Sequence, residues 1–263
     1  MARSYDIDLL YDHAPSLEVR AIVERIRKEM PVEVISGSQW IIALAHSDQI
    51  TNFKEGDLPC VTNIVRNQQP IDLESYRPSL AQTWEWPEAE DALAACKYSV
   101  LLTDFTGSGL SHRDRLRRIT AVVADVAEVT DARVCHWRPA GCLVDPATIR
   151  EKFQFACNVR QFNTDEKVSE ALMDTLGLAA LGLVDIQCYF RGLDPDRIVP
   201  WLFGVAGYVF TNGDVIKDGD TIRGFDPNDS WRCSHRMASV GPERPVIDVD
   251  PGSYSAKRVT RHN

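Results

Sequence analysis

One pattern of apolar spacing recurs three times along the chain and restricts the folds that it can adopt. Each time, a short apolar run is followed by residues with the apolar spacing of a helix, and then by two further short runs joined by a turn. The patterns begin near residues 5, 98 and 184. Each predicts the order strand, helix, strand, strand. This order is common in α+β proteins, so both an internal duplication and chance repetition remain open.

The first pattern predicts a strand over 5–11, a helix over 16–30 that ends at Pro31, and strands over 32–36 and 39–46. Ser16 is expected to cap this helix. The apolar stripe of the helix consists of Val19, Ile22, Val23, Ile26 and Met30.

The second pattern predicts a strand over 98–105, a helix over 112–128, and strands over 132–137 and 142–144. Ser111 and Asp114 have the spacing of a capping box at the start of this helix. The expected core face of the helix is formed by Leu116, Ile119, Val123 and Val126.

The third pattern predicts a strand over 184–191 and a helix that Asp194 caps. Short strands are expected over 214–216 and 220–223, on either side of a turn at Asp218-Gly219. Further strands are predicted over 60–66, 168–175, 231–238 and 245–249, and a short helix is expected after Asp145-Pro146, with Ile149 and Phe153 facing the core.

Together the patterns predict an α/β (α+β) fold of mixed, largely antiparallel sheets with helices packed on one face. A helix that joins two strands of one sheet is normally a crossover between parallel strands, whereas strands joined by short turns pair antiparallel. The length suits one large domain or two ordinary ones. We expect an N-terminal half at 1–145 with two of the units and a C-terminal half at 146–263.

Charge and composition narrow the class of partner and the compartment. The formal net charge is −9, and an acidic surface repels phosphate backbones, so no nucleic-acid partner is expected. No run reaches the roughly 18 apolar residues of a membrane helix. An odd number of cysteines without a Cys-x-x-Cys pair predicts buried, reduced thiols and a cytoplasmic protein. The seven are Cys60, Cys96, Cys135, Cys142, Cys157, Cys188 and Cys233.

Two motifs invite interpretation as binding sites and are better explained otherwise. The basic run 112–118, after the glycine-containing loop 106–109, lacks the spacing of known phosphate-binding loops and is expected to be a solvated helix face. Cys135-His136 with Cys142, and Cys233 with His235, could supply zinc ligands only if the strands met. Their spacing is irregular, so neither a metal nor a cofactor is expected.

Motifs for nucleophilic catalysis are also lacking. Ser108 lies in Gly-Ser-Gly without the Gly-x-Ser-x-Gly spacing of a nucleophile elbow. No catalytic residue is therefore named. Asp174 lies in an apolar, glycine-punctuated segment and needs a partner if it is buried; Arg191 and Arg223 are the candidates.

An acidic-aromatic stretch at 84–92 is the best candidate for partner binding. Exposed tryptophan ringed by charge is typical of interface hot spots. The alternative is that one tryptophan packs in the core while the acids favour a helix N-terminus. The candidate residues are Trp84, Glu85, Trp86, Glu88, Glu90 and Asp91.

The C-terminal half resembles a bacterial family known only as domain of unknown function 4261. The resemblance lies in Met173 to Leu183, Tyr189 to Pro195, Asn212 to Thr221 and Pro245 to Asp248, and the strand around Cys135-His136-Trp137 also fits. It carries no catalytic residues over to this chain. Genes of the family are similar to those near secreted toxins, including type VI secretion loci, which implies an immunity or accessory role.

The leading hypothesis is a cytosolic binding protein, an immunity protein that neutralises a cognate, basic toxin domain by surface contact. A second hypothesis is an enzyme or small-ligand protein with a pocket near Asp104, His112 or His136. A third is an adaptor or accessory subunit of a type VI secretion system.

Overall fold

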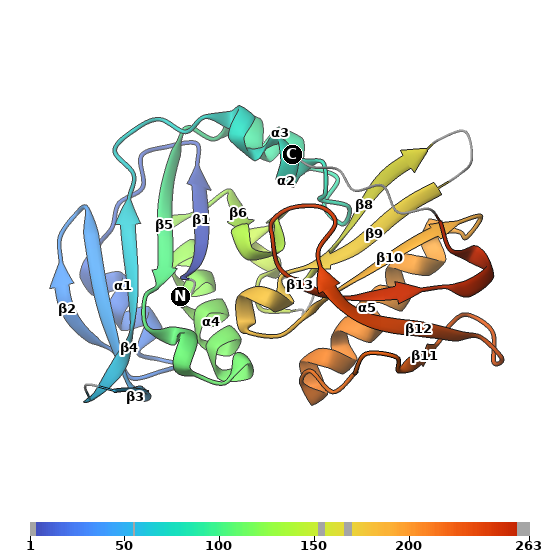
Figure 1. Ribbon diagram of the computed structural model, residues 1–263. Helices are drawn as coiled ribbons and strands as arrows, with labels where there is room; N and C mark the ends of the chain where they lie inside the picture. The colour runs from blue at the N-terminus through green and yellow to red at the C-terminus, as the bar shows by residue number, and fades with distance from the viewer. Residues whose placement is uncertain (1–3, 55, 152–155, 166–169, 257–263) are drawn as a thin grey trace. The chain divides into compact units, whose positions relative to one another are not determined.

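A computed structural model describes residues 4–54, 56–151, 156–165 and 170–256 of the chain. The chain divides into two compact units, Met1–Ala156 and Cys157–Asn263 (Figure 1). The division falls after Ala156 because the turn at Pro146–Thr148 packs on a helix of the first unit. Each unit is described by itself below.

The first unit is built on a seven-stranded sheet in which all neighbouring strands are antiparallel. The strand order is β2-β3-β4-β5-β1-β6-β7, so β1 lies between β5 and β6. The strands are β1 (Tyr5–Tyr11), β2 (Glu33–Gly37), β3 (Ile41–Phe53), β4 (Gly56–Arg66), β5 (Tyr98–Asp104), β6 (Val134–Trp137) and β7 (Cys142–Val144).

Successive residues of β1 point to opposite faces of the sheet and contact different layers of the first unit. Tyr11 bonds through its hydroxyl to Thr130, near the end of the long helix α4 (His112–Thr130), which packs against α1 (Val19–Ile26). Leu10 points to the other face, where it joins a core cluster with Tyr76 and Leu93. Those two residues belong to a second layer made of the 3₁₀ turn η1 (Leu73–Tyr76) and the short helices α2 (Arg77–Leu80) and α3 (Ala89–Ala95).

Of the two helix caps predicted in the first unit, one is confirmed and one is wrong. Ser111 caps α4 by accepting a hydrogen bond from the Asp114 backbone N–H at 3.1 Å. The prediction of a cap at Ser16 is wrong. The helix α1 begins at Val19, because the chain stays extended through Glu18, and no side chain caps it.

The second unit is a six-stranded sheet of order β11-β12-β13-β10-β9-β8. The pair β10–β13 is parallel and the other neighbours are antiparallel. One helix, α5 (Pro195–Asn212), packs on β8, β9 and β10, and Asp194 caps it through the Asp196 N–H at 3.0 Å. The strands are β8 (Asn158–Asp165), β9 (Glu170–Leu176), β10 (Asp185–Arg191), β11 (Thr221–Arg223), β12 (Ser230–Met237) and β13 (Pro245–Asp250).

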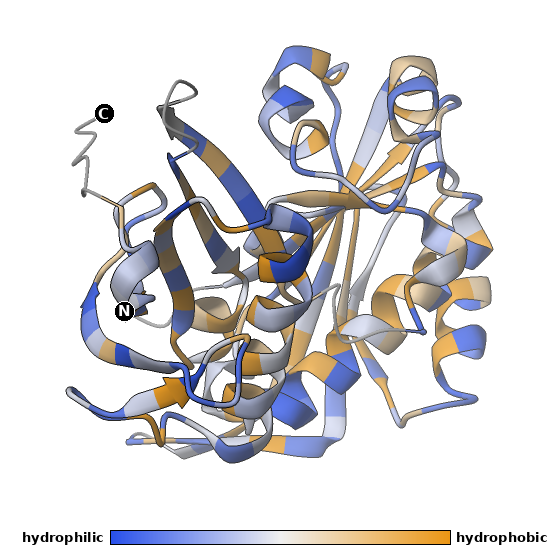
Figure 2. Cartoon of the chain, turned by 90° about the vertical axis from the view of Figure 1, so that its right-hand side faces the viewer, coloured by the Kyte–Doolittle hydropathy of each residue, from blue (hydrophilic) through white to orange (hydrophobic). Residues whose placement is uncertain are grey.

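The predicted fold class is confirmed: the chain is an α+β protein with two mostly antiparallel sheets. In Figure 2, bands of hydrophobic and hydrophilic residues alternate along the helices, as a one-sided core contact requires. No helix in the described ranges is both long and apolar enough to cross a membrane. All seven cysteines are buried, as predicted.

The order strand, helix, strand, strand occurs three times in the chain, but the three units are connected differently within their sheets. In the third unit the last two strands are β11 and β12, and not the predicted pair 214–216 and 220–223. Each helix-linked strand pair is parallel within its sheet, and each following hairpin is antiparallel. However, β5 and β6 have only β1 between them, whereas β10 and β11 are separated by β13 and β12, and β1 and β2 by three strands. A shared element order therefore does not amount to a shared sheet topology.

Two local predictions are wrong, and one strand was not predicted. Residues 214–216 do not form a strand, because the Ile216 carbonyl accepts from the His235 side chain at 2.7 Å instead of entering the ladder. Within residues 146–151, the helix expected after Asp145-Pro146 is limited to the 3₁₀ turn η4 (Pro146–Thr148). Strand β8 was not predicted. Ile149 is buried as expected, and Phe153 lies outside the described residues.

Candidate functional site

The predicted acidic-aromatic stretch lies in the second layer of the first unit, within residues 72–96, which we call the 72–96 segment. Trp84 is 60% exposed, whereas Trp86 is half-buried against the core cluster of that layer. One tryptophan therefore anchors the segment and the other faces solvent. The four acids of the stretch are all exposed: Glu85, Glu88, Glu90 and Asp91.

Hydrogen bonds fix the 72–96 segment on the sheet. The Thr83 hydroxyl accepts from the Leu143 N–H of β7 at 2.9 Å and donates to the Ser79 carbonyl at 2.8 Å. At the other end, the Lys97 N–H donates to the Tyr11 carbonyl at 2.7 Å. The exposed side chains of residues 84–91 therefore lie between two points, Thr83 and Lys97, at which the chain is hydrogen-bonded to the sheet.

A polar relay connects the same segment to two neighbouring strands of the sheet, β1 and β6. His136 on β6 lies directly across from Asp8 on β1, and its Nδ1 is 3.1 Å from Asp8 Oδ2. On the other side of the ring, Nε2 is 2.9 Å from the Ser79 Oγ of α2. We call Ser79, His136 and Asp8 the relay.

The chemistry of Asp8 determines the direction of these hydrogen bonds. Burial raises the pKa of Asp8, but hydrogen bonds from His136 and Arg138 outweigh burial, and the net pKa lies below its ordinary value. Asp8 is thus a carboxylate that only accepts, so the tautomer of a neutral imidazole that fits this contact has its proton on Nδ1. Nε2 is then an acceptor, and the Ser79 hydroxyl donates to it.

Two neighbours complete the environment of the relay. Arg138 binds both Asp8 oxygens at 2.6 Å through Nε and Nη2, and its side chain is 46% exposed. Tyr76 meets the His136 ring edge-on at 5.1 Å. Burial, followed by the charge of Asp8, raises the pKa of Tyr76 to about 12, so its hydroxyl keeps its proton. The relay is a hydroxyl, an imidazole and a carboxylate in hydrogen-bonded series.

Of the three residues named for the pocket hypothesis, only His136 is in the relay. Asp104 is buried beneath α4, where it binds Arg115 at 2.7 Å and Arg118 at 3.0 Å. His112 is the first residue of α4. The structure therefore pairs Asp104 and His136 with different partners.

The basic run 112–118 is only partly the solvated face that we expected. Arg113 and Arg117 are exposed, but Arg115 and Arg118 are buried on Asp104. The loop before the run is tightly packed there as well, since a Cβ atom on Gly107 would collide with the Asp104 carboxylate and the Arg118 guanidinium. This region is an ion-paired part of the core and not an open phosphate cradle.

The candidate zinc ligands do not come together. Cys135 is buried on the opposite face of β6 from His136, which is engaged by Asp8 and Ser79. His235, in the second unit, contacts the Ile216 carbonyl. Within the described ranges, no group of three or more His, Cys, Asp or Glu side chains is arranged to hold a metal ion.

A cavity of about 430 Å³ opens beside the C-terminal end of α4. Alanine side chains form much of its wall, and Glu128, Asp131 and Arg150 bring charges of both signs. Arg150 also pairs with the buried Asp125, whose pKa is raised to about 6, chiefly by burial. The mixed charges do not select one class of ligand.

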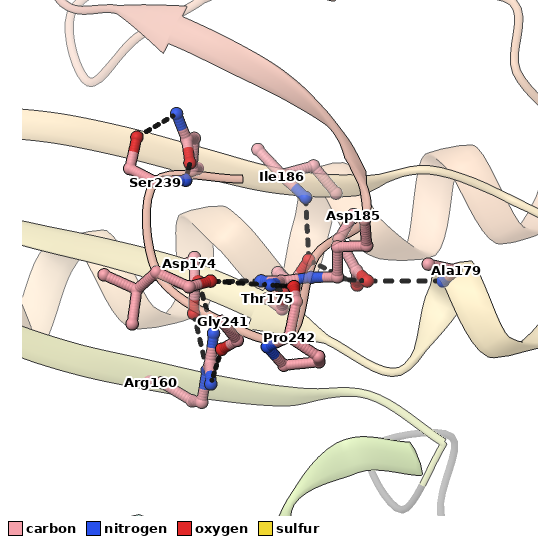
Figure 3. A network of polar contacts seen from close by, with 12 residues as sticks. Arg160, Asp174, Thr175, Ala179, Asp185, Ile186, Ser239, Gly241 and Pro242 are labelled. Carbon is pink, nitrogen blue, oxygen red and sulfur yellow. Dashed lines mark hydrogen bonds and ion pairs between the residues drawn. The ribbon is translucent and has the colours of Figure 1, made fainter. Parts of the chain in front are cut away.

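The second unit contains a buried network of two acids and two arginines (Figure 3). Asp174 is bound by Arg160 at 2.6 Å and by Arg244 at 2.7 Å. Arg244 also reaches Asp185 at 3.1 Å. All four side chains are buried. We call this set the Asp174 network.

The Asp174 network corrects the expected partners of Asp174. Arg191 and Arg223 are exposed, and β11, which carries Arg223, is four positions from β9 in the sheet. Arg160, in contrast, lies directly opposite Asp174 on the neighbouring strand β8. The arginines also fix the loop before β13, because Arg160 donates to the Gly241 carbonyl and Arg244 donates to the Val240 and Pro242 carbonyls. The charges balance, and the role that follows is structural.

Sequence reasoning missed Ser79, Asp8 and Arg138. One signal was present: Asp8 is an acid within an apolar strand, and a buried acid requires a partner. Ser79 carried none, because it is an ordinary serine in a proline-containing segment.

Comparison with known families finds a match for part of the second unit. The model of a family described as a domain of unknown function (DUF4261) matches residues 174–250, from β9 to the end of β13. This supports the resemblance that the sequence indicated. The matched segment contains Asp174, Asp185 and Arg244 of the Asp174 network. No curated protein and no solved structure matches the chain.

Proposed function

We propose that the chain binds a basic protein partner through the exposed side chains of the 72–96 segment. This acidic-aromatic face consists of Trp84, Glu85, Glu88, Glu90 and Asp91. The observation that carries the proposal is the 60% exposure of Trp84 among four exposed acids, between two points, Thr83 and Lys97, at which the chain is hydrogen-bonded to the sheet. A large aromatic side chain that is preorganised before binding adds contact area at low entropic cost.

Charge supports a basic partner. The acids of the face belong to a chain whose net charge is −9. An acidic surface accelerates association with a positively charged one. The partner class we propose is a toxin domain that this chain neutralises in the cytoplasm as an immunity protein. The resemblance of residues 174–250 to DUF4261 is compatible with this role.

The test is affinity measurement between the full chain and the product of the adjacent gene, by pull-down and calorimetry. Trp84→Ala is expected to weaken binding by roughly 2 kcal/mol or more, about 30-fold, as for a hot-spot residue. Reversing Glu85, Glu88 and Glu90 to Lys should slow association and reduce its dependence on salt.

Matched variants control for nonspecific effects. Trp40→Ala removes another exposed tryptophan of the first unit, and charge reversal at Glu18, Glu33 and Asp48 changes the net charge equally. Both should leave binding within about twofold of wild type. The proposal fails if the face variants bind as wild type does, or if the neighbouring product neither binds nor is neutralised. Stable co-purification with secretion machinery instead would support an adaptor.

A further inference from the structure

We propose that Ser79, His136 and Asp8 form a nucleophilic triad that accepts the acyl group of small esters on Ser79 Oγ. Ser79 belongs to the same 72–96 segment as the acidic-aromatic face, but the inference does not depend on partner binding. It depends on the order of the three groups, on their protonation and on the access of solvent to Ser79.

The order and the protonation are those that nucleophilic catalysis requires. The nucleophile must donate its proton to the base, and an acid must hold the base in the right tautomer. Here the Ser79 Oγ lies 2.9 Å from His136 Nε2, and His136 Nδ1 lies 3.1 Å from Asp8 Oδ2. With the ring proton on Nδ1, Ser79 donates to His136 and His136 donates to Asp8. The three residues come from α2, β6 and β1, so no single local motif produces the arrangement.

The burial gradient runs in the direction that a reactive site needs. Asp8 is 4% exposed and His136 14% exposed, whereas Ser79 is only partly buried. The acid is thus shielded from water, which strengthens its hold on the imidazole, while the imidazole and the hydroxyl belong to partly exposed residues. Partial burial favours a small acyl group over a bulky one.

The chemical step balances with the groups present and water. Ser79 Oγ attacks the ester carbonyl and passes its proton to His136 Nε2. Collapse of the tetrahedral intermediate breaks the bond to the alcohol, which leaves with that proton. Water then attacks the acyl-serine and passes one proton to His136 Nε2. Collapse of this second intermediate breaks the bond to Ser79 Oγ, which takes that proton back from His136 as the acid is released.

Because of Arg138, we expect acyl transfer to Ser79 to be slow. It holds both Asp8 oxygens at 2.6 Å, so Asp8 shares its charge between a guanidinium and the imidazole. The positive charge formed on His136 during attack is therefore less well stabilised than beside a free carboxylate. Covalent labelling of Ser79 is a more sensitive readout than steady-state turnover.

The test is incubation of the full chain with a fluorophosphonate probe, followed by mass spectrometry of the peptide that contains Ser79. The expected result is one adduct, on Ser79 Oγ. His136→Gln and Asp8→Asn should each slow labelling by about 100-fold or more, as for members of a catalytic triad. Ser75→Ala is the matched control, because Ser75 is an exposed serine on the same segment that bonds to the Asp72 carbonyl.

The result on wild type decides the question even if a variant fails to fold. Absence of a Ser79 adduct under conditions that label a known serine hydrolase fully would overturn the proposal. So would equal labelling of Ser75 and Ser79, or His136→Gln with an unchanged rate and a native circular dichroism spectrum. None of these outcomes bears on partner binding, which Trp84→Ala tests separately.

Discussion

The relay of the first unit and the Asp174 network of the second both place an aspartate against an arginine, yet they differ in exposure. In the Asp174 network the Arg244 side chain is 1% exposed and every charge is compensated inside the sheet. In the relay, Arg138 is 46% exposed and the series ends at a partly exposed hydroxyl. The Asp174 network is buried and its charges balance, so its role is structural. In the relay, exposure increases from Asp8 towards the surface, so the relay connects the core to the surface.

The difference predicts unequal costs of disruption. Removing one partner from a fully buried ion network leaves a charge that water cannot reach, whereas a half-exposed arginine regains water. Loss of the aspartate should therefore cost more in the Asp174 network than in the relay. Four experiments, two on these clusters and two on other parts of the units, are ranked from the largest expected effect to the smallest.

Asp174→Ala is expected to have the largest effect. It leaves Arg160 and Arg244 buried with only Asp185 between them, and such a loss typically costs about 3–5 kcal/mol. Denaturant unfolding should show the loss, and hydrogen exchange should localise it to the β9 and β10 amides of the second unit. Asp196→Ala, at an exposed acid of α5, is the control. A loss below about 1 kcal/mol would mean that the two arginines find other compensation.

Acid should weaken the first unit through His46, a buried histidine outside the relay. Burial, followed by the charge of Arg118, lowers the pKa of His46 to about 3. The unfolded chain therefore takes up a proton from about pH 6.5 downwards while the folded chain does not. The contribution of His46 is complete above pH 6.5 and is lost progressively as the pH falls towards 3.

Between pH 7 and 4.5 this contribution should fall by about 2–3 kcal/mol. The readout is hydrogen exchange of the β3 and β4 amides as a function of pH. His46→Gln should flatten that dependence, and His13→Gln, at an exposed histidine, should not. If His46→Gln keeps the wild-type slope, another group of the first unit is responsible.

Asp8→Asn sharpens the comparison, because it changes the relay without changing its size. It weakens the contacts to His136 and Arg138, and we expect a loss of about 1–3 kcal/mol, less than for Asp174→Ala. Exchange should increase in α2 and β6, which the relay joins. Asp6→Asn, two residues away on the same face of β1, is the control. A loss as large as that of Asp174→Ala would show that exposure of Arg138 gives no relief.

Local structure could be predicted from the sequence, but side-chain partnership could not. Apolar spacing located β1, β5, β10 and the long helices, because that spacing is set by which face is buried. Strand β8 escaped detection because Arg160 is buried next to Val159, which breaks the alternation of a half-buried strand. The inward arginine makes sense only when Asp174 lies opposite.

The relay was beyond prediction for a related reason. Its two hydrogen bonds join residues 57 and 128 positions apart, and they exist because β6 pairs with β1 while α2 packs on the neighbouring strand β7. Nothing in one sequence fixes that strand order. His136 could be named as a candidate, but its two partners come from the order of strands in the sheet.

Helix caps give the smallest expected effect and test local prediction directly. Ser111→Ala and Asp194→Ala remove side chains that accept from backbone N–H groups at 3.1 and 3.0 Å, in the first and second units respectively. Each should cost about 1 kcal/mol. Ser16→Ala, where the sequence predicted a cap and α1 starts later, should cost less than about 0.5 kcal/mol. Because the capping interaction is local, the two true caps should cost the same despite the difference between their units. The measurement is denaturant unfolding of each variant. Clearly different losses of unfolding free energy for Ser111→Ala and Asp194→Ala would mean that the cost of losing a cap depends on its unit and not only on the geometry of its helix.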